Sequence, residues 1–106
     1  MKIISSSGLV KILNNKIVHV AGLVASRQRP KTANGTVFLS LEDECGLINV
    51  ICWKNIYDKF YREILLSKLI LVKGRVHNES DTINIIAQSI KDLSHLLELL
   101  PYIDKP

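Results

Sequence analysis

The feature that most constrains the fold is a change in the spacing of apolar residues along the chain. Five stretches have the alternation or the residue types of β-strands. These stretches are residues 16–28, 36–42, 47–53, 68–77 and 82–87. Between the third and the fourth, Ile56, Phe60 and Ile64 recur at helical spacing, with Asn55 as a candidate N-cap. The predicted order is therefore three strands, one helix and two strands.

The second and third strands indicate which side chains face the core. In the second strand, Val37, Leu39 and Leu41 alternate with Phe38 and Ser40. The third strand follows after a short turn and alternates in the same way, so the two strands are predicted to form a hairpin. Because side chains alternate between the faces of a strand, the sequence predicts Phe38 and Ser40 on the outer face.

This order predicts an all-β fold, a five-stranded OB-fold (Greek-key) barrel with a helix between strands 3 and 4. Gly22 lies inside the long first strand, where a bend is needed to close so small a barrel. The expected division is an N-terminal extension at residues 1–15, the OB domain at 16–91, and a short C-terminal helix and tail at 92–106. The helix is predicted from a stripe of leucines that ends at Pro101: Leu93, Leu96, Leu97 and Leu100.

Length and composition exclude several other classes of protein. A chain of 106 residues has room for one domain. Its apolar stretches are far shorter than the roughly 20 residues of a membrane-spanning helix. The N-terminus lacks the pattern of a signal peptide, so the sequence predicts a cytoplasmic protein with no membrane partner. Cys45 and Cys52 are too few for a disulfide framework or a metal site, and no cofactor is expected.

Positive charge is unevenly distributed along the chain. The segment from Met1 to Leu41 has six basic residues and no Asp or Glu, although the formal net charge of the whole chain is only +4. Such a distribution is typical of proteins that bind a polyanion. The alternative is a solvated basic surface, and charge alone does not distinguish the two.

The candidate site follows from where OB folds usually bind ligands, on strands 2 and 3 and the loop before them. Basic side chains of that loop would neutralise phosphates, and Phe38 would stack on a base. Lys73 and Arg75 would extend the positive track on a neighbouring strand. The predicted nucleic-acid-binding residues are Arg27, Arg29, Lys31, Phe38, Ser40, Trp53, Lys73 and Arg75.

Each of these residues also has a purely structural interpretation. Phe38 could be a partly covered surface aromatic, and Trp53 could anchor the junction with the helix. Arg75 could pair with Glu79 or Asp81. No catalytic residues are predicted, because the sequence has no pairing of nucleophile and base and no spacing of metal ligands. The module itself is therefore not expected to be an enzyme.

One known family shares a set of these residues. They are Gly22, the run Arg27–Pro30, Phe38, the run Leu41–Glu44, Gly46, Trp53, Gly74 and Arg75. In this pattern the chain, over roughly residues 16 to 94, resembles the C-terminal OB domain of the error-prone branch of the DNA polymerase III alpha family. The resemblance implies contact with a single-stranded template during replication or repair. Lys31 stands where the family usually has a glycine, and the ending Asp104-Lys105-Pro106 suggests a free-standing homologue.

The sequence therefore predicts a module that binds single-stranded nucleic acid, with single-stranded DNA as the expected partner. RNA is an alternative, as in the anticodon-binding domains of some aminoacyl-tRNA synthetases. A second alternative is a protein-interaction module, in which the leucine stripe pairs with another chain. The resemblance adds replication or repair proteins as partners, and the oligomeric state stays open.

Overall fold

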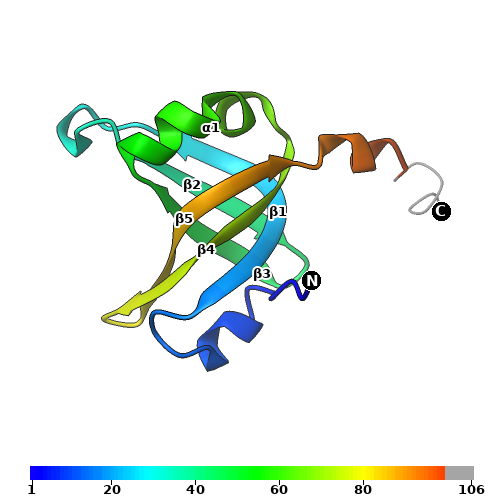
Figure 1. Ribbon diagram of the computed structural model, residues 1–106. Helices are drawn as coiled ribbons and strands as arrows, with labels where there is room; N and C mark the ends of the chain where they lie inside the picture. The colour runs from blue at the N-terminus through cyan, green and yellow to red at the C-terminus, as the bar shows by residue number, and fades with distance from the viewer. Residues whose placement is uncertain (100–106) are drawn as a thin grey trace.

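Five strands form one closed barrel in the computed structural model, which describes residues 1–99 (Figure 1). Around the barrel the strands follow the order β1-β2-β3-β5-β4. Their bounds are β1 (Ile17–Gln28), β2 (Val37–Asp43), β3 (Gly46–Cys52), β4 (Leu69–Glu79) and β5 (Thr82–Asp92), with helix α1 (Lys54–Leu66) between β3 and β4. The predicted OB fold and order of elements are confirmed.

Strand β1 closes the barrel by changing partner halfway along its length. Its residues from Ile17 to Leu23 pair with β4, and those from Leu23 to Gln28 pair with β2. At Gly22 the backbone of β2 comes so close that a Cβ atom would lie 2.7 Å from the carbonyl oxygen of Glu42. The close approach of the two strands thus requires a glycine at this position. The bend expected at Gly22 stays a prediction, and the irregularity in the pairing of β1 with β2 lies between Val24 and Ser26.

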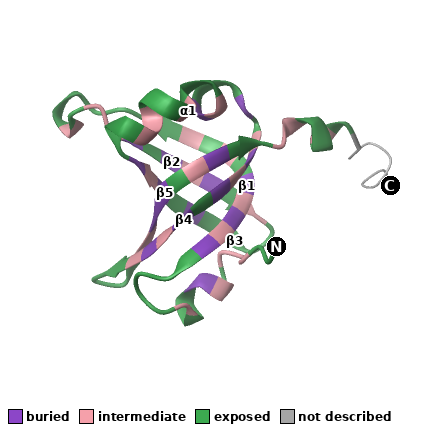
Figure 2. Ribbon diagram, in the orientation of Figure 1, coloured by how far each residue is buried: buried purple, intermediate pink, exposed green. Residues whose placement is uncertain are grey.

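The inward-facing side chains form a single apolar core. Figure 2 shows the buried residues, in purple, distributed along the strands. The alternation predicted for β2 and β3 is confirmed, since the inward residues of both strands are at most 2% exposed: Val37, Leu39, Leu41, Ile48, Val50 and Cys52. Full burial of such a side chain contributes about 1.5–3 kcal/mol. Strand β5 runs to Asp92, beyond the predicted end at Ala87, because Ile90 continues the pairing with β4 and is itself buried.

Helix α1 begins two residues earlier than the sequence indicated, so the prediction of Asn55 as N-cap is wrong. Trp53 occupies the cap position, and its carbonyl oxygen accepts hydrogen bonds from the backbone N–H groups of Ile56 and Tyr57. Asn55 therefore falls within the first turn. Lys54 and Asp58 form an ion pair of 2.6 Å across that turn. Ile64 is the fully buried residue of the helix and packs into the core.

The N-terminal segment packs against the barrel through both apolar and polar contacts. Leu9, in the 3-10 helix η1 (Gly8–Lys11), is 4% exposed and belongs to the core. The Asp43 carboxylate accepts hydrogen bonds of 2.7 Å from the backbone N–H and the hydroxyl of Ser6. Residues 1–15, predicted as an extension, thus share the core of the barrel; the division of the chain into domains stays a prediction.

The segment after β5 is a short 3-10 helix, η3 (Ser94–Leu99). The leucine stripe predicted a short C-terminal helix, and the structure has a helix of the tighter 3-10 type directly after the strand. The Asp92 carboxylate accepts a hydrogen bond from the backbone N–H of Ser94. Leu100 and Pro101 lie outside the described residues. Within residues 1–99, no helix has the length and apolar character to cross a membrane.

Candidate nucleic-acid interface

A row of polar side chains crosses four strands on the outer surface of the barrel. Ser26 of β1 lies opposite Ser40 of β2, Ser40 lies opposite Asn49 of β3, and Asn49 is in register with Asn84 of β5. Residues paired in this way point to the same face of a sheet. The row lines a shallow pocket of about 200 Å³ together with residues of the neighbouring row.

Phe38 lies in a second row of outward-facing residues, beside the polar row that contains Ser40. It lies opposite Gln28 of β1 and Ile51 of β3, and its side chain is 37% exposed. The predicted outward orientation of Phe38 and Ser40 is confirmed. A half-exposed aromatic ring beside hydroxyl and amide groups offers a stacking surface and hydrogen-bonding groups at one place.

Trp53 follows β3 at the end of the barrel that helix α1 covers. Its backbone caps α1, while its side chain remains 50% exposed. Trp53 is two residues beyond Ile51, and the alternation of β3 continues to this position. The residue thus anchors the helix junction through its backbone and presents its ring to solvent.

The loop between β1 and β2 carries two of the predicted cations in exposed positions. The Arg29 guanidinium lies 4.4 Å from the centre of the Tyr57 ring, a cation–π contact that connects the loop to α1. Lys31 begins the 3-10 helix η2 (Lys31–Ala33). After η2 the backbone is left-handed at Asn34 and Gly35, with φ of 52° and 86°. This conformation returns the chain to β2 near Phe38.

Arg27 is held at the end of the barrel under α1. It pairs with Leu39 of β2 near the end of β1 and is itself exposed. The guanidinium donates a hydrogen bond of 2.6 Å to the carbonyl oxygen of Ile64 and a second to that of Ser67. These carbonyls have no partner within the helix, and a cation at a helix C-terminus is favourable. The structure thus gives Arg27 an intramolecular partner; binding of a phosphate by Arg27 stays a prediction.

Lys73 and Arg75 lie away from Phe38. Their strand, β4, pairs with β1 and β5 and has β2 and β3 across the barrel, so it neighbours the strand of Arg27 and is not adjacent to that of Phe38. Binding of nucleic acid by Lys73 and Arg75 stays a prediction. Lys73 lies opposite His19, and Arg75 lies opposite Ile17. The Arg75 guanidinium donates a hydrogen bond of 2.9 Å to the Asn15 side-chain oxygen. That contact takes the place of the ion pair with Glu79 or Asp81 considered from the sequence.

The face around Phe38 also contains polar residues that sequence reasoning did not select. They are Ser26, Gln28, Asn49 and Asn84. Their outward positions follow from the same alternation that indicated Phe38, but their alignment depends on strand register. The parallel pairing of β3 with β5, which adds Asn84 to the row, joins strands distant in the sequence.

No metal centre is apparent in the part of the chain that the structure describes. Residues 1–99 contain no group of three His, Cys, Asp or Glu residues positioned to hold a metal ion. Burial raises the pKa of the Cys52 thiol to about 12, so this thiol is protonated at neutral pH. What the exposed face offers is stacking and hydrogen bonding.

Comparison with protein families agrees with this geometry. A family model described as an OB-fold nucleic acid binding domain, of the tRNA anticodon type, matches residues 18–93. The chain belongs to this family. It is 40% identical over 98 residues to error-prone DNA polymerase 1 of Rhizobium meliloti, covering 92% of this chain and 9% of that one. With the error-prone DNA polymerase of Saccharophagus degradans it shares 46% over 91 residues, covering 86% and 9%. The chain thus spans about 9% of the length of these relatives, and the resemblance to error-prone polymerases is confirmed.

Solved structures share the fold at lower sequence identity. Aspartyl-tRNA synthetase from Entamoeba histolytica superposes with a TM-score of 0.69 at 18% identity, covering 84% of this chain and 20% of that one. Asparaginyl-tRNA synthetase from Pyrococcus horikoshii gives 0.64 at 20% identity, covering 89% and 28%. These likenesses support the barrel architecture of the OB fold.

Proposed function

We propose that this domain binds single-stranded DNA across the outer face of β2 and β3. The observation that carries the proposal is the half-exposed Phe38 ring, in register beside the polar row of Ser26, Ser40, Asn49 and Asn84. A base stacked on Phe38 would place its edge near hydroxyl and amide groups. Stacking on an aromatic side chain is worth about 1–3 kcal/mol per base and accepts any base.

The loop between β1 and β2 supplies the electrostatic part of the proposed site. Arg29 and Lys31 are exposed in this loop, which leads directly into the strand of Phe38. Phosphates beside them would release condensed counterions, so binding should weaken as salt rises. Trp53, half-exposed at the end of β3, would provide a second stacking surface for a strand that continues along the barrel.

DNA is proposed over RNA because the relatives at 40–46% identity are error-prone DNA polymerases. In a polymerase of that kind this domain would hold single-stranded template near the polymerising part. The hydroxyl and amide groups of the polar row could equally contact a 2′-hydroxyl, so RNA is the competing ligand.

The experiment is fluorescence anisotropy of labelled single-stranded DNA, duplex DNA and single-stranded RNA over a salt series. The proposal predicts binding of the single strands with a steep decrease in affinity as salt rises, and preference for DNA over RNA. Preference for RNA would assign the site to the anticodon-binding type. Absence of binding to all three at low salt would contradict nucleic-acid binding by this domain alone.

A further inference from the structure

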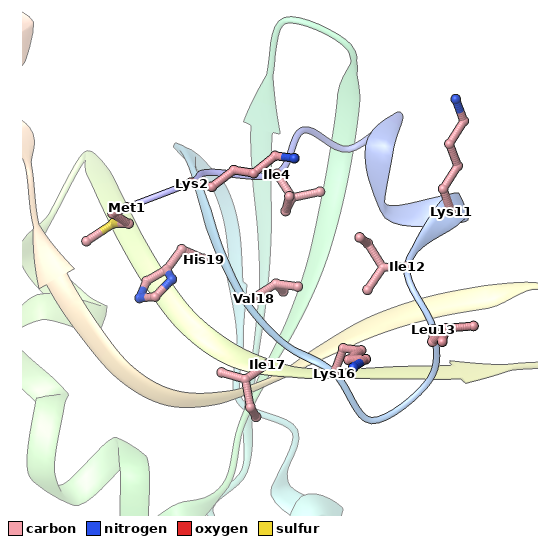
Figure 3. A pocket seen from close by; sticks show the side chains of 10 residues that line it. All are labelled: Met1, Lys2, Ile4, Lys11, Ile12, Leu13, Lys16, Ile17, Val18 and His19. Carbon is pink, nitrogen blue, oxygen red and sulfur yellow. The ribbon is translucent and has the colours of Figure 1, made fainter.

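A separate groove lies between the N-terminal segment and β1 (Figure 3). It has a volume of about 650 Å³, and Figure 3 shows Ile4, Ile12 and Val18 directed into it from three different segments. The N-terminal segment is held in place by the Ser6–Asp43 hydrogen bonds and by buried Leu9. The groove is therefore part of the folded domain.

The walls of this N-terminal groove are mainly apolar and accessible. Met1, Leu13 and Ile17 line it and are 84%, 71% and 46% exposed. These apolar side chains are therefore accessible to a ligand. A contiguous exposed apolar surface is typical of interaction sites. Its lining contains no Phe, Tyr or Trp, so it lacks the stacking platform found around Phe38.

Cations surround the groove. Lys2, Lys11 and Lys16 are among its lining residues. On β4, Lys73 and Arg75 lie opposite His19 and Ile17, the β1 residues of the same surface. The chain has no Asp or Glu from Met1 to Leu41, so the segments that form the groove contribute no negative side chain. An apolar groove bordered by basic side chains is complementary to an acidic ligand that also has bulky apolar groups.

The strand beside the groove has an incompletely paired edge. Residues 17–22 of β1 pair with β4 on one side, and β2 begins to pair only at Leu23. In the described part of the chain, the other edge of this half-strand has one bridge, from Ile3 to His19, with a hydrogen bond of 2.8 Å from Ile4 N–H to the His19 carbonyl. Such an edge favours a ligand in extended conformation, which can add backbone hydrogen bonds.

We propose that the N-terminal groove binds an extended acidic peptide segment of a partner protein. Its bulky apolar side chains contact Met1, Leu13 and Ile17, the exposed apolar residues of the lining, and its carboxylates lie near Lys2, Lys11 and Lys16. A peptide fits better than a nucleic acid because the groove is apolar and has no aromatic side chain for bases. This site is independent of the Phe38 face.

The test is selection of peptides from a displayed random library on the 106-residue chain, followed by titration of one synthesised winner. We expect the selected peptides to combine Asp or Glu with Leu, Ile, Phe or Met, and their affinity to decrease with salt. The variant Lys2→Glu/Lys11→Glu/Lys16→Glu should weaken the winner by about tenfold or more, since several close charge pairs become repulsive. The matched control Lys59→Glu/Lys68→Glu/Lys91→Glu changes three other exposed lysines and the net charge equally, and should bind nearly as the parent does.

A second variant tests the same groove in case the triple variant does not fold. Leu13→Asp changes one highly exposed apolar residue of the groove and should abolish peptide binding while the circular dichroism spectrum stays unchanged. Enriched peptides without acidic residues, equal binding by both triple variants, or no enrichment at all would overturn the proposal. Loss of oligonucleotide binding in the Lys2/Lys11/Lys16 variant, with no peptide binding by the parent, would assign the groove to nucleic acid instead.

Discussion

The face around Phe38 and the N-terminal groove belong to the same barrel but differ in chemistry. The Phe38 face combines one half-exposed aromatic ring with hydroxyl and amide groups. The groove is apolar and bordered by lysines. Strand β1 contributes to both, because its first half lines the groove and its second half carries Ser26 and Gln28. One strand thus joins two surfaces with different ligand preferences.

This difference teaches that excess positive charge along a sequence does not by itself locate a nucleic-acid site. Of the basic residues before Leu41, three line the groove, namely Lys2, Lys11 and Lys16. Arg27 is bound to the carbonyl oxygens at the end of α1. Arg29 and Lys31 remain in the loop that leads to Phe38. The proposed DNA contact therefore depends more on stacking and less on charge than the sequence suggested.

The largest expected effect on stability comes from a substitution in β1 at the point where its two halves meet. Gly22→Val should destabilise the domain by about 3 kcal/mol, because the new side chain would collide with the β2 backbone at Glu42. Both surfaces should be lost together. Urea unfolding followed by the fluorescence of the single tryptophan, Trp53, measures this change.

The matched control for Gly22→Val is Ala25→Val, a similar enlargement at an exposed position on the same strand. It should shift the unfolding midpoint little. Equal midpoints for Gly22→Val and the parent would show that β1 and β2 do not approach as closely at Gly22 as the structure indicates.

The second-largest expected effect is on ligand binding and distinguishes the Phe38 face from the N-terminal groove. Phe38→Ala should weaken binding of single-stranded DNA by about tenfold, the loss of one stacked base, and leave the midpoint of unfolding nearly unchanged. Binding of the acidic peptide should not change. Anisotropy titrations of both ligands on the same protein provide the measurement. The control Tyr61→Ala removes an aromatic ring of similar exposure on α1 and should affect neither ligand. An unchanged DNA affinity in Phe38→Ala would remove this residue from the site.

The third effect distinguishes two arginines of one segment. Arg27→Ala should lower the free energy of unfolding by about 1–2 kcal/mol, because two carbonyl oxygens at the end of α1 lose a charged donor. Arg29→Ala should leave the free energy of unfolding nearly unchanged. It should make the slope of log affinity for DNA against log salt concentration shallower by about 1. Urea unfolding and salt-dependent anisotropy on both variants test the pair. The reverse result, with Arg29→Ala unstable and Arg27→Ala weak in DNA binding, would contradict the structural assignment.

The smallest effect concerns Asp43, which holds the N-terminal segment against the β2–β3 turn. Burial opposes ionisation, but hydrogen bonds from Ser6, Cys45 and Gly46 outweigh it and lower the pKa of the Asp43 carboxyl below its ordinary value of 3.8. The stability that these bonds contribute is therefore present above pH 3.8 and is lost as the pH falls through the lower, folded-state value.

Asp43→Asn should accordingly cost about 1 kcal/mol at neutral pH and much less in acid. Urea unfolding of both proteins at a series of pH values between neutral and acid measures this difference. Peptide binding should weaken as well, because the N-terminal groove loses its attachment to the barrel. A stability difference that grows toward low pH would be inconsistent with the hydrogen bonds at Asp43.

Sequence reasoning predicted the features that depend on local patterns. The alternation in β2 and β3 correctly predicted that Leu39 and Val50 face the core and that Phe38 and Ser40 face outward. One local prediction was wrong, because Trp53 caps α1 in place of Asn55. The predicted short helix after β5 is present as a 3-10 helix. The error lies at an element boundary, where a few hydrogen bonds decide the outcome.

Features that depend on contacts between distant segments could not be predicted from the sequence. Lys73 and Arg75 were expected to extend the positive track on a neighbouring strand, but the order of strands around the barrel separates their strand, β4, from β2. The residues Asn49 and Asn84 were not selected, since only the parallel pairing of β3 with β5 brings them into one row. A bulge in β1 precedes Arg27, and the side chain of this residue bonds to the end of α1.

The amino-acid sequence by itself determined the order of elements, the inward faces of the strands and the membership of the OB family. Those properties arise from spacing between near neighbours, and burial of apolar side chains enforces them throughout the chain. The tertiary structure alone decided which cations lie together, what Arg27 bonds to, and that residues 1–19 form a groove on the barrel. These arrangements depend on strand order and register, because closing the barrel brings together residues far apart in the chain.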